Sequence, residues 1–283
     1  MTVRERLGAG RAALAGTLPP ERAALDAEVL LAAVLGRGRW HLLAHPEERV
    51  APEASAKYCS WLQRRAWGEP LEYLTGRADF YGLMLEVTPA VLVPRPETEV
   101  LVEAALSALR PLTGPLVVDV GTGSGAIALA VAANHPTARV LAVDCSLEAL
   151  TVAHRNASAH SLLDRVLTIG CDLLSCLDAR FDAVLANLPY VATSDLATVS
   201  APVVRYEPRL ALEGGPDGLA LVKRLLSQAR GRLAPGGTIL AEIGVGQGDE
   251  AAAIAGGLYD SALVDLLPDL AGLDRVLRVR MAP

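Results

Sequence analysis

Four consecutive residues of this 283-residue chain, Asn187, Leu188, Pro189 and Tyr190, have types suited to holding a planar polar group. An asparagine side chain offers a carbonyl acceptor and an NH2 donor, so it can hold another amide or the edge of an amino-purine. Pro189 lacks an N–H and restricts Leu188 to an extended backbone, which leaves carbonyl oxygens free to accept from a ligand. Tyr190 supplies a flat apolar face. An ordinary turn is the alternative interpretation, because asparagine and proline are common turn residues.

The elements that must position these residues are strands of an α/β sheet. Residues 183–186, directly before the tetrapeptide, form an apolar run typical of a buried strand. Ligands of open α/β sheets bind outside the carboxyl ends of the strands. Residues 116–130 predict a second strand, a glycine-rich turn and a helix, with glycines that let the backbone approach a nucleotide-like group. That turn contains Gly121, Thr122, Gly123, Ser124 and Gly125.

The glycine loop differs from a dinucleotide-binding loop in two respects. Ala126 stands where a third, widely spaced glycine would cradle a pyrophosphate. Asp119, just before the loop, would repel phosphate and favour a cationic group. The sulfonium and amino groups of S-adenosylmethionine fit this charge better than a dinucleotide does. Taken alone, the loop is also compatible with a plain strand-to-helix turn.

Two further carboxylates follow predicted strands. Asp144 ends the strand at residues 139–144, near the separation at which a ribose-binding acid follows a glycine loop. Asp172 follows the strand at residues 166–169, where it could accept from an adenine amino group. A single acid at a strand end is usually a cap or turn residue. Acids after three consecutive strands, followed by the tetrapeptide, form a more specific constellation.

Composition limits the class of protein. Hydrophobic residues make up 52% and charged residues 20% of the chain, so a large core is available. A net charge of −6 disfavours a strongly basic nucleic-acid surface. No window approaches the roughly 18 uninterrupted apolar residues of a membrane span, and we expect no membrane association. The cysteines and histidines lack metal-ligand spacing, so we expect reduced thiols, a cytoplasmic protein and no metal.

The flanking regions predict the remaining organisation. Residues 1–74 read as helical, with helices over 21–35 and 52–68 and with Arg64 and Arg65 directed to solvent. Residues 77–87 alternate around a Tyr-Gly turn, which predicts a β-hairpin. At the C-terminal end, the pattern predicts a turn at 235–237, a strand at 238–243, a strand-to-helix connection at 244–248, and an antiparallel pair at 261–266 and 275–280. Arginines on this last strand are expected to form a solvated edge.

Together these residues resemble the protein-glutamine methyltransferases that modify peptide-chain release factors (the HemK/PrmC group). The resemblance spans nearly the whole chain. Its most distinctive strings are Val-Pro-Arg-Pro-Glu-Thr-Glu at 93–99, and Tyr-Glu-Pro-Arg-Leu-Ala-Leu with Gly-Gly-Pro-Asp-Gly at 206–218. Further matches lie at 70–76, 80–82, 119–125 and 242–244. Leu188 departs from the family's usual Asn-Pro-Pro-Tyr, and its Asn-Leu-Pro-Tyr form looks like that of adenine dimethyltransferases of ribosomal RNA.

The resemblance implies a fold and a domain organisation. It implies an α/β, Rossmann-like class I methyltransferase with a seven-stranded, mostly parallel sheet and a small all-helical N-terminal domain joined by a β-hairpin. Residues 1–74 would form the helical substrate-docking domain, 75–95 the β-hairpin linker, and 96–283 the S-adenosylmethionine-dependent methyltransferase domain.

The resemblance also implies site residues. S-adenosylmethionine would lie across residues 121–125, with its ribose on Asp144, its adenine near Asp172 and Leu173, and Asn187 beside it. The substrate would be the side-chain amide of the glutamine in the Gly-Gly-Gln motif of release factors. Asn187 and the carbonyl of Leu188 would hold the amide hydrogens, Pro189 would restrain Leu188, and Tyr190 would form a wall.

Three other functions stay open. An adenine amino-group methyltransferase acting on RNA or DNA would suit Asn187 and Tyr190 equally well, since a flipped base presents an amino group. The other two are an NAD-binding oxidoreductase and a non-enzymatic S-adenosylmethionine binder. The negative net charge disfavours the adenine methyltransferase. We expect a monomer whose partners are release factors and not a stable nucleic acid.

Overall fold

The computed structural model describes residues 1–282, which separate into two compact units. Unit 1 comprises residues 1–77 and 201–206, and unit 2 comprises residues 78–200 and 207 onward. No helix within residues 1–282 is both long enough and apolar enough to cross a membrane.

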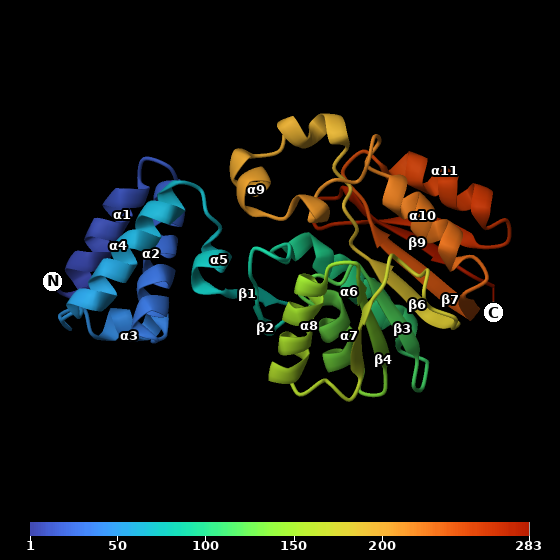
Figure 1. Ribbon diagram of the computed structural model, residues 1–283, viewed down its shortest axis with the longest axis horizontal. Coiled ribbons are helices and arrows are strands. Elements are labelled where there is room, and N and C mark those ends of the chain that lie inside the picture. The colour runs from blue at the N-terminus through green and yellow to red at the C-terminus, as the bar shows by residue number, and fades with distance from the viewer. Residues whose placement is uncertain (283) are drawn as a thin grey trace. The chain divides into compact units, whose positions relative to one another are not determined.

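Unit 1 is a bundle of helices around an aliphatic core (Figure 1). Pro20 and Pro52 stand at the first position of its two longest helices, where the missing N–H costs nothing. Gly36 ends the first of them with left-handed backbone at φ 62°. The helices of the bundle are α1 (Val3–Leu14), α2 (Pro20–Leu35), α3 (Arg39–Ala44), α4 (Pro52–Ala66) and α5 (Leu71–Thr75). Unit 1 also includes α9 (Ala201–Tyr206), which contributes no residue to this core.

The expected solvent exposure of Arg65 is wrong. Its Nε donates to Asp26 at 2.7 Å, and the Asp26 carboxylate is fully buried. Arg22 forms a second ion pair with the same carboxylate at 2.7 Å. Because a buried charge without partners is strongly destabilising, Asp26 draws Arg65 inward from the polar face of α4.

The predicted hairpin is confirmed as β1 (Arg77–Phe80) and β2 (Leu83–Glu86). Tyr81 and Gly82 at its turn have φ values of 48° and 76°, the pattern of a turn whose twist matches that of the strands. The backbone N–H of Tyr81 donates to Glu99 at 2.9 Å, which fastens the turn to the start of α6 (Glu99–Leu109).

Unit 2 contains a seven-stranded sheet in the order β5-β4-β3-β6-β7-β9-β8, which confirms the predicted fold class. Strands β3 to β7 run parallel, and β9 pairs antiparallel with both β7 and β8. The strands are β3 (Leu116–Val120), β4 (Arg139–Asp144), β5 (Val166–Gly170), β6 (Phe181–Ala186), β7 (Leu233–Glu242), β8 (Leu263–Pro268) and β9 (Asp274–Arg280).

Helices cover both faces of this sheet (Figure 1). Alternation along β3 places Val117 in one apolar cluster and Val118 in the other. The first cluster includes α6, α7 (Ala126–Asn134) and α8 (Leu147–Ala159), and the second includes α10 (Ala220–Ala229) and α11 (Gly248–Leu258). Single turns of 3-10 helix occur at η1 (Pro96–Thr98), η2 (Thr193–Ala197) and η3 (Arg209–Ala211).

Two C-terminal expectations are wrong. Residues 235–237 belong to β7 instead of forming a turn, and Gly237 lets this strand pass close to the carbonyl of Phe181. β9 lies inside the sheet and is not an edge, and two of its arginines are paired, while Arg280 is exposed. Arg278 donates to Asp265 of β8, and Arg275 donates to Asp269 at 3.0 Å.

Candidate active site

A cavity of about 450 Å³ opens at the carboxyl ends of β3, β4 and β6. Its volume falls within the range of small-molecule and cofactor sites. Of the residues that sequence reasoning assigned to a site, those lining the cavity are Gly121, Thr122, Gly123, Ser124, Asp144, Asp172, Leu173, Asn187, Leu188 and Pro189. Gly125 and Tyr190 do not line it.

The glycine loop is built by left-handed backbone. Gly121, Gly123 and Gly125 have φ values of 73°, 56° and 84°, a region that side-chain-bearing residues rarely adopt. Gly125 precedes α7, and a Cβ there would lie 3.3 Å from Ala153 of α8. Its role is therefore close helix packing, while Gly121 and Gly123 expose backbone to the cavity.

Asp119 lies beneath this loop and does not line the cavity. The sequence predicted a role beside a cationic ligand, and its position does not provide one. The side chain is fully buried, and one oxygen accepts from the Thr122 hydroxyl at 2.6 Å and from the Ala128 N–H at 3.1 Å. Burial raises the pKa of Asp119 to about 7, against the lowering effect of these two hydrogen bonds. Asp119 thus joins the glycine loop to the first turn of α7.

Asp144 faces the cavity and also holds two segments of its wall. One oxygen accepts from the backbone N–H of Gly123 at 3.0 Å, and the other accepts from that of Ser146 at 2.9 Å. Ser146 caps α8 by accepting from the Ala149 N–H. The carboxylate is therefore fixed where a hydroxyl-bearing ligand would meet it.

Asp172 is held less firmly than Asp144. Its side chain is 59% exposed and pairs with Arg224, which also lines the cavity. The neighbouring Leu173 is buried with φ at 53°, so its side chain is available as an apolar surface at the cavity.

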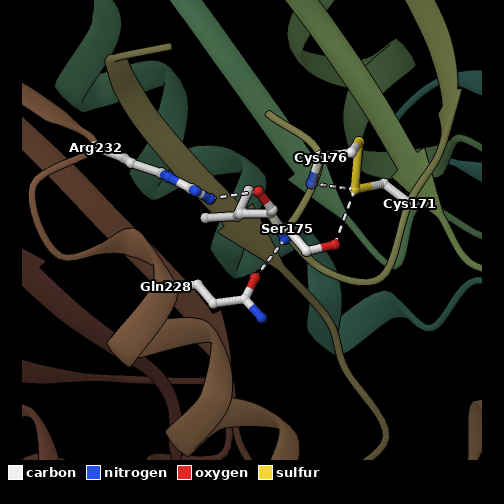
Figure 2. The surroundings of a disulfide bond; sticks show 6 residues. Cys171, Ser175, Cys176, Gln228 and Arg232 are labelled. Atoms are coloured by element: carbon white, nitrogen blue, oxygen red, sulfur yellow. Dashed lines mark hydrogen bonds between the residues drawn. A yellow bond between two sulfur atoms is a disulfide. The ribbon is translucent and has the colours of Figure 1, made fainter. Parts of the chain in front are cut away.

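The structure joins Cys171 and Cys176 in a disulfide, so the expectation of reduced thiols does not hold for this pair (Figure 2). The two residues occupy one short turn after β5, with Cα atoms 6.0 Å apart. Arg232 donates to the carbonyl of Leu174, and Gln228 accepts from the Leu174 N–H at 2.8 Å, so the turn is anchored to the region of α10. The spacing of five residues matches no common redox or metal motif, which is why sequence reasoning missed it.

The tetrapeptide follows β6 directly. Leu188 is only 4% exposed, and its Cδ2 would be 3.0 Å from a Cβ placed on Gly121. The glycine loop and the tetrapeptide are therefore in direct contact through Leu188. Only a glycine at position 121 leaves room for that contact.

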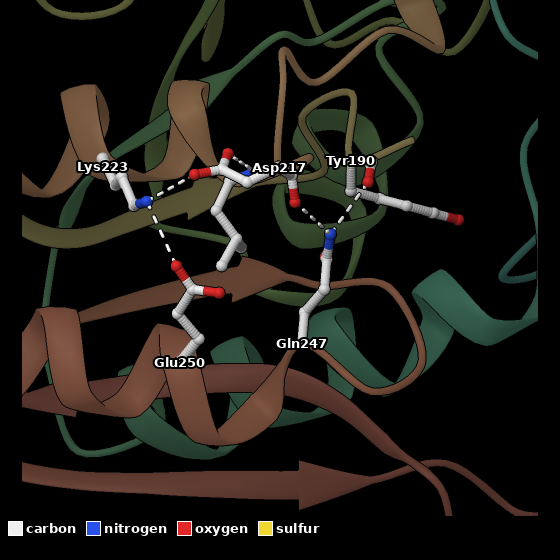
Figure 3. A network of polar contacts seen from close by, with 6 residues as sticks. Tyr190, Asp217, Lys223, Gln247 and Glu250 are labelled. Carbon is white, nitrogen blue, oxygen red and sulfur yellow. Dashed lines mark hydrogen bonds and ion pairs between the residues drawn. The ribbon is translucent and has the colours of Figure 1, made fainter. Parts of the chain in front are cut away.

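Tyr190 packs behind the tetrapeptide and does not line the cavity. A Cβ on Gly244 would lie 3.2 Å from the Tyr190 ring, so the ring packs along the connection after β7. Gln247 donates to the Tyr190 carbonyl at 3.0 Å and accepts from the Gly244 N–H at 2.7 Å (Figure 3). The segment 244–248 is thus a strand-to-helix connection, as predicted, and it supports the tetrapeptide from behind.

The Gly-Gly-Pro-Asp-Gly string supports the same segment from another side. A Cβ on Gly214 would lie 2.5 Å from the Pro189 carbonyl, and one on Gly218 would lie 2.3 Å from that of Tyr190. Asp217 accepts from Lys223 at 2.6 Å, and this ion pair closes the turn (Figure 3). Glycine is required here because backbone packs on backbone.

Sequence reasoning missed two residues behind Asn187. The Asn187 Nδ2 donates to the Thr98 hydroxyl at 2.9 Å, and that hydroxyl donates to Glu242 at 2.6 Å. Thr98 belongs to η1 and lines the cavity, whereas Glu242 ends β7 and is 1% exposed. Their only signal was membership in the strings at 93–99 and 242–244.

Charged groups lie around the buried carboxyl of Glu242. Burial raises the pKa of Glu242 to about 7, with the Thr98 hydrogen bond and Arg275 acting in the opposite direction. Arg95, in the same string as Thr98, donates to the buried Glu207 at 2.5 Å. The strings at 93–99 and 206–212 are thus tied together at the rim of the cavity, which Arg95 and Pro208 line.

Comparison with known proteins adds a family context. Family models match as the PrmC N-terminal domain over residues 7–76 and as the methyltransferase small domain over residues 97–216. The release factor glutamine methyltransferase of Moorella thermoacetica is 47% identical over 277 residues, which cover 97% of this chain and 97% of that protein. Its namesake from Burkholderia pseudomallei is 42% identical over 265 residues, covering 89% of this chain and 90% of that protein.

A solved structure shares the fold. The 16S rRNA N2 G1207 methyltransferase of T. thermophilus, in complex with AdoMet and guanosine, has a TM-score of 0.52 and 19% identity. The match covers 72% of this chain and 49% of that one.

Proposed function

The chain belongs to the release factor glutamine methyltransferase family, and from that membership we propose its reaction. It transfers a methyl group from S-adenosylmethionine to the side-chain amide nitrogen of the glutamine in the Gly-Gly-Gln motif of peptide-chain release factors. The observation that carries this proposal is that Asn187, Leu188 and Pro189 line one cavity with the glycine loop and Asp144.

The residues of the cavity fit S-adenosylmethionine. The volume of about 450 Å³ accommodates a nucleoside with a side arm. Gly121 and Gly123 let backbone approach the ligand, and Asp144 is a fixed acceptor for ribose hydroxyls. In this proposal the adenine lies near Asp172 and Leu173. Asn187 adjoins both S-adenosylmethionine and the substrate amide. When bound, S-adenosylmethionine supplies an electrophilic methyl group on sulfonium.

The chain's own task is to position a poor nucleophile. An amide nitrogen shares its lone pair with the carbonyl, so it reacts only when held in an attacking geometry. Asn187 and the Leu188 carbonyl accept the two amide hydrogens, and Pro189 keeps Leu188 extended. Alignment of this kind is worth several kcal/mol. Hydrogen bonds that strengthen as positive charge develops on nitrogen add to it.

We also propose how the rest of the chain takes part. Residues 1–74 dock the release factor, residues 75–95 link them to the methyltransferase region at 96–283, and Tyr190 stiffens the tetrapeptide. In this proposal the enzyme acts as a monomer, since one chain supplies both the glycine loop and the tetrapeptide of the cavity. The net charge of −6 supports a protein substrate over a stable nucleic-acid partner. Release factors as substrates place the proposed activity in the cytoplasm.

The test is methyl transfer to purified full-length release factor, read as the mass of the Gly-Gly-Gln peptide. We expect that peptide to gain one methyl group, and we expect no gain with a release factor whose glutamine is replaced by alanine. The Asn187→Ala enzyme serves as the matched control. Transfer to RNA or DNA adenine with none to the peptide would establish the alternative function instead.

A further inference from the structure

Three side chains from distant segments, Asn187, Thr98 and Glu242, form a linear chain of hydrogen bonds (the relay) that ends at the cavity. Asn187 donates to Thr98 at 2.9 Å, and Thr98 donates to Glu242 at 2.6 Å. Thr98 is 4% and Glu242 1% exposed, so water does not compete for their hydrogen bonds. The relay runs from the end of β7, through η1, to the residue after β6.

The direction of this relay follows from counting protons. An ionised carboxylate can only accept, and a hydroxyl has a single proton to donate. Because Thr98 gives its proton to Glu242, its oxygen can only accept from Asn187. The Asn187 amide must therefore turn its NH2 toward Thr98, which leaves Oδ1 as the atom free to meet a ligand in the cavity.

We propose that Thr98 and Glu242 are positioning residues that fix the orientation of the Asn187 amide, so that its carbonyl oxygen and not its NH2 group faces the substrate. This inference rests on the proposed function, because a glutamine amide nitrogen carries two hydrogens and needs two acceptors. The Leu188 carbonyl is one and Asn187 Oδ1 is the other. A reversed Asn187 would set one NH2 group against another and lose that hydrogen bond.

The same relay gives the site a pH dependence. Burial raises the pKa of Glu242 to about 7. The other charged or titratable groups acting there are Arg275 from β9, Arg95 and Glu97 from the segment before α6, and Tyr190 after β6. Once protonated, Glu242 can donate to Thr98, which frees the Thr98 proton for Asn187 Oδ1 and lets the amide turn over. The methylation rate is therefore expected to fall as pH drops through about 7.

The first test uses paired variants with wild-type release factor as substrate. Thr98→Val keeps the shape and removes the hydroxyl, and it should lower kcat by about tenfold or more while S-adenosylmethionine affinity changes by less than about threefold. Thr98→Ser, which restores a hydroxyl, should recover most of the lost rate. Thr151→Val makes the same substitution on the exposed face of α8 and serves as the matched control.

The second test follows the pH profile. Glu242→Gln still offers an acceptor to Thr98 but does not titrate, so the decline in kcat below about pH 7, measured at saturating S-adenosylmethionine, should disappear. Melting temperatures of all variants report whether each one folds. A wild-type kcat in Thr98→Val, or an unchanged acid limb in Glu242→Gln, would overturn the relay.

A third readout does not require turnover. In 15N-labelled protein, the side-chain NH2 signal of Asn187, identified by its loss in Asn187→Ala, should shift with a midpoint near pH 7 in wild type and stay constant in Glu242→Gln. No shift in the wild type would also overturn the relay. Failure of the proposed function has a different signature, namely no methylation of release factor by the wild-type enzyme.

Discussion

Asp144→Ala should weaken cofactor binding by about tenfold to a hundredfold. The carboxylate accepts from Gly123 at 3.0 Å and from Ser146 at 2.9 Å. In the proposed function it also accepts from the ribose hydroxyls of the cofactor. Loss of one buried hydrogen-bond partner costs about 1–3 kcal/mol, and about 1.4 kcal/mol corresponds to tenfold in Kd. Alanine removes the ligand's acceptor and also releases the glycine loop, so we place the result toward the upper part of this range.

Titration calorimetry with S-adenosylmethionine measures the effect directly, with Asp172→Ala as the matched control. Asp172 also lines the cavity, but its side chain is 59% exposed and paired with Arg224. An exposed pair of this kind contributes about 0–1 kcal/mol, so Asp172→Ala should change Kd by less than about fivefold. An Asp144→Ala Kd within threefold of wild type would remove this carboxylate from the cofactor site. Equal losses of cofactor affinity in both variants would refute the argument that the firmly held Asp144 matters more than the exposed Asp172.

Three further predictions concern other parts of the chain. Leu188→Pro should change the methylation rate by less than about tenfold, or ~1.4 kcal/mol in the barrier, because the carbonyl of residue 188 remains. Asn187→Ala should lower the rate by about a hundredfold or more in the peptide-mass assay. The reverse order of effects would mean that the side chain at 188 selects a different substrate. Deleting residues 1–74 should leave the calorimetric Kd for cofactor unchanged and sharply reduce methylation of intact release factor, and full activity of the truncated enzyme would place docking elsewhere. Burial raises the pKa of Asp119 to about 7, so the folded state holds a proton that the unfolded chain releases near pH 4, and unfolding free energy falls as pH rises from about 4 to 7. Asp119→Asn should lessen this fall in urea unfolding at pH 5 and pH 8, and an identical fall in both proteins would show that Asp119 does not cause it.

Local patterns predicted the elements well where each was governed by its own residues. The helix over 21–35 and the hairpin around Tyr81 and Gly82 were both predicted correctly. In each case the signal lay within the element, as an apolar stripe or a turn residue with positive φ. The assignment of residues 235–237 to a turn failed because Gly237 serves close backbone contact within β7.

Pairings between distant segments could not be predicted in this way. The expected edge strand at 275–280 lies inside the sheet, since β8 pairs on its far side. Thr98 is 89 residues from Asn187 and 144 residues from Glu242 in the sequence. No periodicity or turn signal connects such positions, so their partnership becomes visible only when β6 and β7 pair and the loop before α6 covers their ends.

The glycine loop and the tetrapeptide, which line the same cavity, each lie above a buried carboxyl that accepts from a threonine hydroxyl. Beneath the glycine loop, Asp119 accepts from Thr122 at 2.6 Å, and beneath the tetrapeptide, Glu242 accepts from Thr98 at 2.6 Å. Burial raises the pKa of both carboxyls to about 7. Acid therefore protonates both carboxyls over one pH range, and a wild-type rate profile would combine the two effects. Loss of loop order should appear in the cofactor Kd, whereas loss of Asn187 orientation should appear in kcat at saturating cofactor. The Asp119→Asn and Glu242→Gln variants separate these contributions because each removes one titrating group and leaves the other in place.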